Sequence, residues 1–149
     1  MDLKLIKGFD EAVAQKTVAA VQDKFPRLVF LWAEQNNRLN DNRYEWSYGN
    51  GMEDSSNYIV LPHPGKLVAL SLNVAVAPSS SCVVEVRLNN QSAGSITLRA
   101  GQTYMVSLLS AMQQAEIGGR VNFRTVTAGG AERGTVLLVY ALTELDFEV

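Results

Sequence analysis

The sequence is poor in residues that carry out chemistry. It has one cysteine, Cys82, and one histidine, His63, in 149 residues. Protein zinc sites draw several ligands from these residue types, so no zinc centre is expected. A nucleophile–base pair would have to use His63, which lies between two prolines, and Cys82, which lies among strand residues such as Val84 and Val86. We therefore expect a protein that is not an enzyme and that needs no cofactor.

Several partner classes are also disfavoured. A single cysteine rules out an internal disulfide framework and fits a product folded in a reducing compartment. Thirteen basic against fifteen acidic residues, with no basic run, argue against nucleic acid. Lysine and aspartate interrupt the N-terminus, so it does not resemble a signal peptide. The longest uncharged apolar stretch is broken by Asn, Pro and Ser, so no membrane span is expected.

Two loops contain residue types that occur in binding sites. Residues 53–57 (EDSSN) could offer oxygen ligands to calcium, but they lack the spacing of a calcium loop, and a solvated loop is the favoured interpretation. The glycine-rich stretch AGGAERG lacks the Lys-Ser/Thr ending of a phosphate loop. Neither loop therefore predicts a site, and only calcium stays open.

Residues 1–26 are patterned differently from the rest of the chain. Residues 9–25 contain no glycine or proline and predict a short helix that ends at Pro26. Its apolar residues recur at spacings of three and four and form one stripe. The stripe favours two alternatives: the helix docks to a partner or self-associates, or it packs on its own domain. The candidate attachment residues are Leu3 and Leu5 ahead of the helix and, on the stripe with Ala14, the residues Val18, Val21 and Phe25.

After Pro26 the apolar residues alternate as they do in strands. RLVFLWAEQ, YIVL, KLVALSLNVAVA, CVVEVRLN, SITLRA, TYMVSLL, RVNFRTV and TVLLVYALTEL are separated by turn residues about every ten positions. Together with residues 42–48, they predict eight or nine short strands and an all-β antiparallel sandwich or barrel spanning 27–149. On the strand 82–89, Glu85 and Arg87 alternate as polar residues, and we expect substitutions there to have little effect.

The stretch NRYEWSYGNG at 42–51 raises the question of an aromatic ligand platform. If it is an alternating strand, Tyr44, Trp46 and Tyr48 all point to one face and Glu45 and Ser47 to the other. Ligand-binding aromatics are more often found on loops, so we interpret these three as core residues, with a sugar-stacking platform as the alternative.

The last strand is apolar on both faces. Val136, Leu138, Tyr140 and Leu142 share one face, and the other carries Leu137, Val139 and Ala141. An antiparallel strand with one face in water should be polar there. A chain of this length has one core to offer, so we predict that Leu137, Val139 and Ala141 contact another subunit.

These segments resemble small tailed-bacteriophage virion proteins with a trimeric jelly-roll domain akin to the tumour-necrosis-factor (TNF) and C1q heads. The resemblance covers about 28–145 and is carried by the aromatic-Gly-Asn-Gly stretch, PGKLVALSLNVA and GGRVNFRTV. It implies a homotrimeric antiparallel jelly-roll β-sandwich of the TNF/C1q-like class, here preceded by a short N-terminal helix. It also implies that the subunits press apolar strand faces together at a three-fold axis.

Two functions follow as alternatives. The first is a capsid-decoration or fibre protein of the virion, made in the host cytoplasm and docked to capsid or tail proteins through residues 1–26. The second is a receptor-binding adhesion module of a tail fibre, whose loops bind a host-surface glycan or protein. The short N-terminal segment favours the first, because it suffices only for an anchor or collar. A metabolic enzyme on a cupin-like sandwich is disfavoured by the missing histidine cluster.

Overall fold

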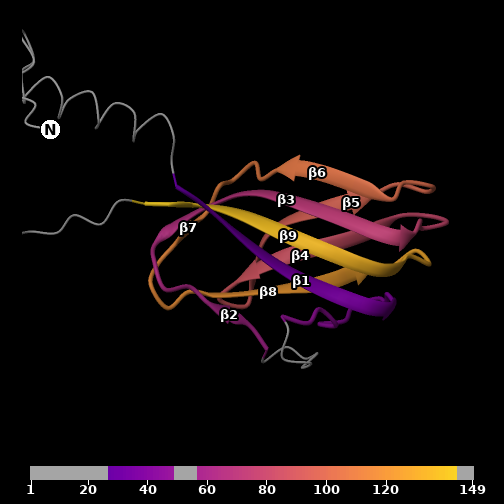
Figure 1. The fold of residues 1–149 in the computed structure, drawn as a ribbon, viewed down its shortest axis with the longest axis horizontal. Helices are drawn as coiled ribbons and strands as arrows, with labels where there is room; N and C mark the ends of the chain where they lie inside the picture. The colour runs from indigo at the N-terminus through magenta and orange to yellow at the C-terminus, as the bar shows by residue number, and fades with distance from the viewer. Residues whose placement is uncertain (1–26, 49–56, 144–149) are drawn as a thin grey trace, which may run out of the picture.

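The computed structural model describes residues 27–48 and 57–143, which form two antiparallel sheets packed against each other (Figure 1). These residues contain no helix, and every strand pair is antiparallel. The expected N-terminal helix, the attachment residues within 1–26 and residues 53–56 of the candidate calcium loop lie outside the described residues.

The first sheet has five strands in the order β1-β9-β3-β6, with β7 also paired to β3. Its strands are β1 Leu28–Arg38, β3 Gly65–Val76, β6 Tyr104–Leu108, β7 Gln114–Ala115 and β9 Glu132–Leu142. The second sheet has four strands in the order β2-β8-β4-β5. Its strands are β2 Ile59–Val60, β4 Cys82–Leu88, β5 Gln91–Leu98 and β8 Arg120–Thr127.

The core lies between the two sheets and is filled by alternate residues of their strands. On β9, Val136, Leu138 and Tyr140 are buried, as the sequence predicted. On β4, the residues that alternate with Val83, Glu85 and Arg87 are buried, namely Cys82, Val84, Val86 and Leu88. Burial of such side chains is the main stabilising contribution, roughly 1.5–3 kcal/mol for each large aliphatic residue.

The pattern on β3 was predicted only in part. A register shift between Leu67 and Ala69 in the pairing with β9 places Leu67 as well as Leu70 in the core. Val68 and Val76, which simple alternation assigns to the core face, are half-buried and 37% exposed, respectively. The extra residue of a β-bulge reverses the alternation on one side of it, and periodicity alone does not reveal it.

The turn between β4 and β5 is shorter than the sequence suggested. Gln91–Gly94, expected as part of a connector, belong to β5. Asn89 and Asn90 form the two-residue turn, with φ values of 51° and 64°. Asparagine tolerates this left-handed conformation better than most residues, and two such residues suit the tight turn that matches the strand twist.

β1 begins and β9 ends at the same end of the sandwich (Figure 1). The Leu142 N–H donates to the Arg27 carbonyl at 2.8 Å and fixes the two strands there. The loop after β1 and the β3–β4 and β8–β9 turns lie at the opposite end. The sandwich therefore has one end where both flanking segments of the chain join it and another formed by turns.

Candidate functional site

The outer face of the five-stranded sheet is apolar across its full width. Opposite Phe30 on β1 lies Val139 on β9, which in turn faces Ala69 on β3 and then Leu108 on β6. Phe30 is 52% exposed and Leu108 71% exposed. One row across four strands thus presents apolar side chains to the solvent.

The neighbouring row continues the same surface. It runs from Trp32 on β1 through Leu137 on β9 and Ser71 on β3 to Val106 on β6. Trp32 and Val106 are both more than half exposed. We call these two rows, with Leu28 and Ala141, the apolar face. Soluble monomers rarely expose a continuous apolar surface of this kind, so it is the strongest candidate for an interaction site.

The structure places all three predicted interface residues on the apolar face. Leu137, Val139 and Ala141 are half-buried, and the larger side chains of Trp32, Phe30 and Leu28 stand opposite them on β1. The contributions of β1 and β6 were not predicted from the sequence. The signal was present, since RLVFLWAEQ, like the last strand, is apolar on both of its faces.

Charged groups lie only at the margins of the apolar face. Glu34 on β1 is opposite Thr135, in the row that continues to Asn73 and Tyr104. Lys66 on β3 is opposite Ala141, at the other end of the strands. The centre of the face therefore carries no charge that a contacting surface would have to neutralise.

An open groove of about 600 Å³ extends the apolar face around the edge of β1. Its apolar lining residues are Phe30, Leu31, Trp32, Tyr48 and Ile59. At one end it is bounded by reciprocal hydrogen bonds between the backbones of Glu34 and Ser47, at 2.9 and 2.8 Å. The groove can accept an apolar side chain from whatever covers the face.

The aromatic stretch does not form the strand that the sequence analysis predicted. Residues 42–48 make only isolated bridges, at Arg43 and Ser47. Trp46 is buried in the core as expected, and Tyr48 is partly buried against it. Tyr44 does not point to the same side as Trp46 and Tyr48. Residues 44–46 are not in a strand, so period-two alternation does not set the directions of the three rings.

Tyr44 instead lies on the outer side of the four-stranded sheet, beside two arginines. The guanidinium carbons of Arg87 and Arg124 are each 5.9 Å from the centre of its ring. The three aromatics therefore form no platform, and the sugar-stacking alternative for this stretch is not supported by their arrangement.

A buried carboxylate holds the same loop in place. Glu45 is 4% exposed and accepts hydrogen bonds from the Asn40 N–H at 2.9 Å and from the Thr125 hydroxyl at 3.0 Å. Thr125 Oγ1 also accepts from Trp46 Nε1 at 3.1 Å. One hydroxyl thus satisfies two buried groups, which ties the loop to β8.

Glu85 is part of an ion-pair cluster, which corrects the expectation that it tolerates change. It is 8% exposed and accepts from Arg87 Nη1 at 2.7 Å and Arg124 Nη1 at 3.3 Å. Burial raises the pKa of the Glu85 carboxyl, but hydrogen bonds from Arg87, Ser92 and Arg124 outweigh it, so the net pKa is lowered. The carboxylate is therefore a structural anion on this sheet.

The candidate chemical groups of the sequence analysis lie in structural positions. Cys82 is fully buried, and burial with the nearby carboxylates of Glu45 and Asp41 raises its thiol pKa to about 11. His63 Nδ1 lies 2.7 Å from the Pro64 carbonyl, to which it donates. Within 27–48 and 57–143, no three His, Cys, Asp or Glu side chains come together in a way that could hold a metal ion. The same ranges contain no helix that could cross a membrane.

Comparison with known proteins identifies no family. No family model matches the chain, and no curated protein matches it. Among solved structures, it is similar to an Eiger TNF from S. frugiperda, with TM-score 0.45 and 7% identity over 84% of this chain and 98% of that one. It is also similar to the acid-stable capsid structure of Helicobacter pylori bacteriophage KHP30, with TM-score 0.42 and 15% identity over 83% of this chain and 100% of that one.

A third similar structure is the Podospora anserina GH26-CBM35 β-(1,4)-mannanase, with TM-score 0.45 and 15% identity. The match covers 84% of this chain but only 30% of the mannanase chain. All three TM-scores are below 0.5, so these likenesses are too distant to assign a function.

Proposed function

We propose that this chain is a non-enzymatic structural protein of a bacteriophage virion, a homotrimeric capsid-decoration or fibre protein that docks through residues 1–26. The sandwich is proposed to be a jelly roll of the TNF/C1q-like class. The placement on a virion rests on the sequence resemblance of residues 28–145, and the assembly rests on the apolar face.

The connections between the strands support the jelly-roll assignment. The chain passes from one sheet to the other at each of the first three connections, from β1 to β2, β3 and β4, again from β5 to β6, and again between β7, β8 and β9. Such repeated crossing wraps the chain around one core, as in double-sheet jelly rolls.

The apolar face is the observation that carries the proposed assembly. Its exposed members come from two strands far apart in the sequence, β1 and β6, and the half-buried residues of β9 lie between them. A continuous surface of this kind differs from a singly exposed apolar residue, which is common and needs no explanation. Covering Trp32, Phe30 and their neighbours with the same surface of other copies removes that area from water, at roughly 25 cal/mol for each Å² buried. The number of three copies follows from the family resemblance.

Docking through the N-terminal segment is supported by where that segment joins the sandwich. Arg27 is at the end where β9 also finishes (Figure 1). A particle contact made by Leu3, Leu5, Val18, Val21 and Phe25 would leave the turns of the opposite end pointing away from the particle. These five residues are proposed to bind capsid or tail protein by strand addition and by the apolar stripe.

The test is a truncated protein that begins at Arg27. It should stay folded and trimeric, with a light-scattering mass near three times that of its own shortened chain, yet fail to decorate particles that lack the native protein. Unfolding of the truncated protein would show that residues 1–26 are core, and normal decoration would place the dock on the sandwich itself. The full chain, tested in parallel on the same particles, is the control.

The second candidate function is adhesion to a host-surface glycan. The turn end of the sandwich favours it, because that end lies away from the proposed dock and carries several exposed arginines. The two functions are compatible, since a docked trimer presents its turn ends outward.

A further inference from the structure

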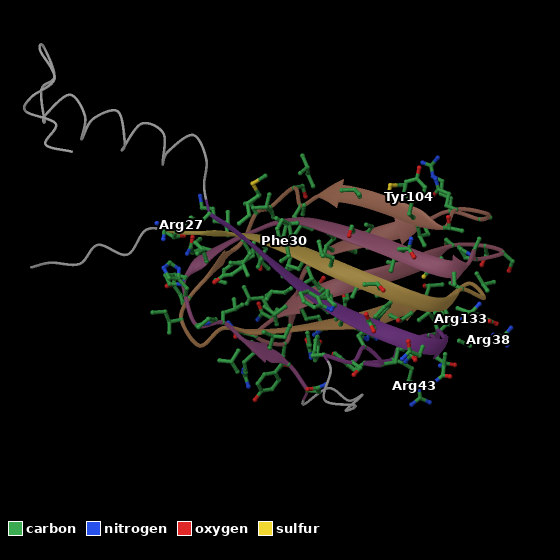
Figure 2. All side chains as sticks on the ribbon, in the orientation of Figure 1. Arg27, Phe30, Arg38, Arg43, Tyr104 and Arg133 are labelled. Atoms are coloured by element: carbon green, nitrogen blue, oxygen red, sulfur yellow. The ribbon has the colours of Figure 1, made fainter. Side chains whose placement is uncertain are left out.

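We propose that the turn end of the sandwich binds an anionic polysaccharide through Arg38, Arg43 and Arg133, which we call the arginine tip. Arg38 ends β1, Arg43 lies in the loop that follows, and Arg133 is at the start of β9. Figure 2 shows the three side chains gathered at the end opposite Arg27. Because the tip is turned outward only if residues 1–26 dock as proposed, this inference rests on the proposed function.

The guanidinium groups of the tip are open to solvent. The Arg38 side chain is 72% exposed and has one contact with Glu132, at 3.6 Å. A single long contact between exposed groups contributes little and leaves Arg38 free to turn to another anion. Among the described residues, neither Arg43 nor Arg133 has a carboxylate within ion-pair distance. Three cations therefore face solvent with one weak internal partner.

The nearby carboxylate of Asp41 forms no ion pair with these arginines. Its Oδ1 accepts from the Ala128 N–H at 2.7 Å, which holds the loop after β1 against the β8–β9 turn. Arg43 is held by its backbone, through reciprocal bonds with Thr125 at 3.1 and 2.9 Å. The backbone at the tip is thus fixed while the arginine side chain stays unpaired, which lowers the ordering cost of binding.

Arg133 occupies a position that stability alone would not give to arginine. Its φ is +52°, in the left-handed region where glycine is favoured. A residue with a Cβ there costs on the order of 1 kcal/mol. Gly129 and Gly130 in the same turn show that glycine is used nearby for positive φ. The proposed binding role gives a reason for an arginine at a position where glycine would be less strained.

The chemistry around the arginines favours a sugar polymer over nucleic acid. Asn36 and Asn37 lie in the register shift of β1 beside Arg133, between the pairs Gln35–Gly134 and Arg38–Glu132. Exposed amides match sugar hydroxyls, and guanidinium forks match carboxylate or sulfate groups. With two carboxylates nearby, the net charge of the tip is too small for a groove along a phosphate backbone, which needs many cations.

The experiment uses the full-length protein on immobilised heparin and polygalacturonate, which carry sulfate and carboxylate groups, with dextran as the neutral polymer. The wild type should be retained on the two anionic columns, elute with salt and pass through dextran. Three tips on one trimer raise the apparent affinity by multivalency, which makes weak single sites measurable. Light scattering of the same sample reports the trimer independently.

The decisive variant is Arg133→Gly. It should weaken apparent binding by about tenfold, because one charge-assisted contact is lost from each tip. At the same time it should melt at the same temperature as the wild type or higher, because the strained φ is relieved. The double variant R38Q/R43Q should abolish retention. Arg120→Gln is the matched control, an exposed arginine at the other end of β8, 5.3 Å from the Tyr58 ring.

Each outcome bears on one proposal. Retention that is weakened in R133G, lost in R38Q/R43Q and unchanged in R120Q supports the arginine tip. If the wild type is trimeric but is not retained, or if R120Q loses retention to the same extent, the arginine tip is not the binding site. Either result leaves the proposed trimer unaffected. Tighter binding to single-stranded DNA than to either polysaccharide overturns the assignment to a sugar polymer. A monomer that still binds heparin through the tip contradicts the proposed assembly instead.

Discussion

Phe30 on β1 lies directly opposite Val139 on β9, and both side chains are on the outer face of the five-stranded sheet. Phe30 is 52% exposed although it is one of the largest apolar residues of the chain. The pair sits near the middle of the apolar face, away from the charged margins at Glu34 and Lys66. A contact with another subunit should therefore be most sensitive at this point.

The Val139→Asp substitution should dissociate the assembly. A carboxylate at 139 would be enclosed between copies without a cationic partner, a change that typically costs about 3–5 kcal/mol. Light scattering should then report a mass near one subunit, 16.3 kDa, or precipitation of the protein.

The matched control is Val60→Asp. Val60 is also exposed, at 56%, but belongs to β2 of the other sheet. It should leave the mass of the assembly unchanged. Trimers of normal stability in V139D, or dissociation in both variants, would show that the apolar face is not the subunit contact.

The sequence predicted those strands in which apolar residues alternate with period two along the chain. The two-faced pattern of β9 revealed both the core side of Tyr140 and the outward side of Val139, because period-two alternation sets side-chain direction. The bulge beside Leu67 and the loop that carries Tyr44 broke that rule, since neither has a periodic signature. The expected trimer and the roles of residues 1–26 stay predictions.

The sites formed by distant residues could not be predicted. The contribution of Val106 to the apolar face depends on β6 pairing with β3, and β3 with β9, which are long-range choices. The arginine tip joins Arg38 to Arg133 only because β1 pairs with β9. Glu85 looked like a solvent residue on its strand, and its partner Arg124 comes from β8.

Replacing Thr125 by valine should destabilise the fold by about 1–3 kcal/mol, because Trp46 Nε1 would be left buried without a partner, while Glu45 keeps its bonds from Asn40. Valine keeps the shape but removes the hydroxyl that donates to Glu45 and accepts from Trp46 Nε1. Urea denaturation monitored by tryptophan fluorescence measures the change. The Thr127→Val substitution on the same strand, where the residue is half-buried, should be close to neutral. Equal effects of the two would contradict the role of the Thr125 hydroxyl.

The stabilising effect of Glu85 should disappear in acid. The pKa of Glu85 is lowered in the folded state from its ordinary value of 4.5, so its ion pairs stabilise the fold above that pH. As pH falls through the lower folded pKa, the carboxylate is protonated and this contribution is lost. The free energy of unfolding should favour wild type over Glu85→Gln near about pH 7, and the difference should shrink below about pH 4.

The exposed Glu116, substituted in the same way, is the control for general acid effects. Its glutamine variant should track the wild type across the pH range. A difference between wild type and E85Q that does not change with pH would mean that the carboxylate charge is not what stabilises this cluster.

The Cys82 thiol should be unreactive until the protein unfolds. It is fully buried, and its pKa of about 11 leaves almost no thiolate near neutral pH. A chromogenic disulfide reagent at about pH 8 should label the native protein slowly and the guanidinium-denatured protein at once. Rapid labelling of one thiol per chain in the native protein would show that the end of the core at β4 opens readily.

Substituting Gly65 by alanine should destabilise the start of β3. A Cβ at this position would lie 2.5 Å from the carbonyl oxygen of Ala141 and even closer to the Tyr140 ring. The Ala141 carbonyl belongs to the backbone of the paired strand, so it cannot turn away as a flexible side chain would. Overpacking of this kind costs about 1–3 kcal/mol, and we expect the upper part of that range.

The control is Gly101→Ala. A Cβ at position 101 meets no atom within 4 Å, but the φ of this residue is +79°, so the variant should lose only about 1–2 kcal/mol of stability through backbone strain. Thermal unfolding of the three proteins compares the two costs, and a G65A variant no less stable than G101A would show that β3 and β9 separate enough at this end to admit a methyl group.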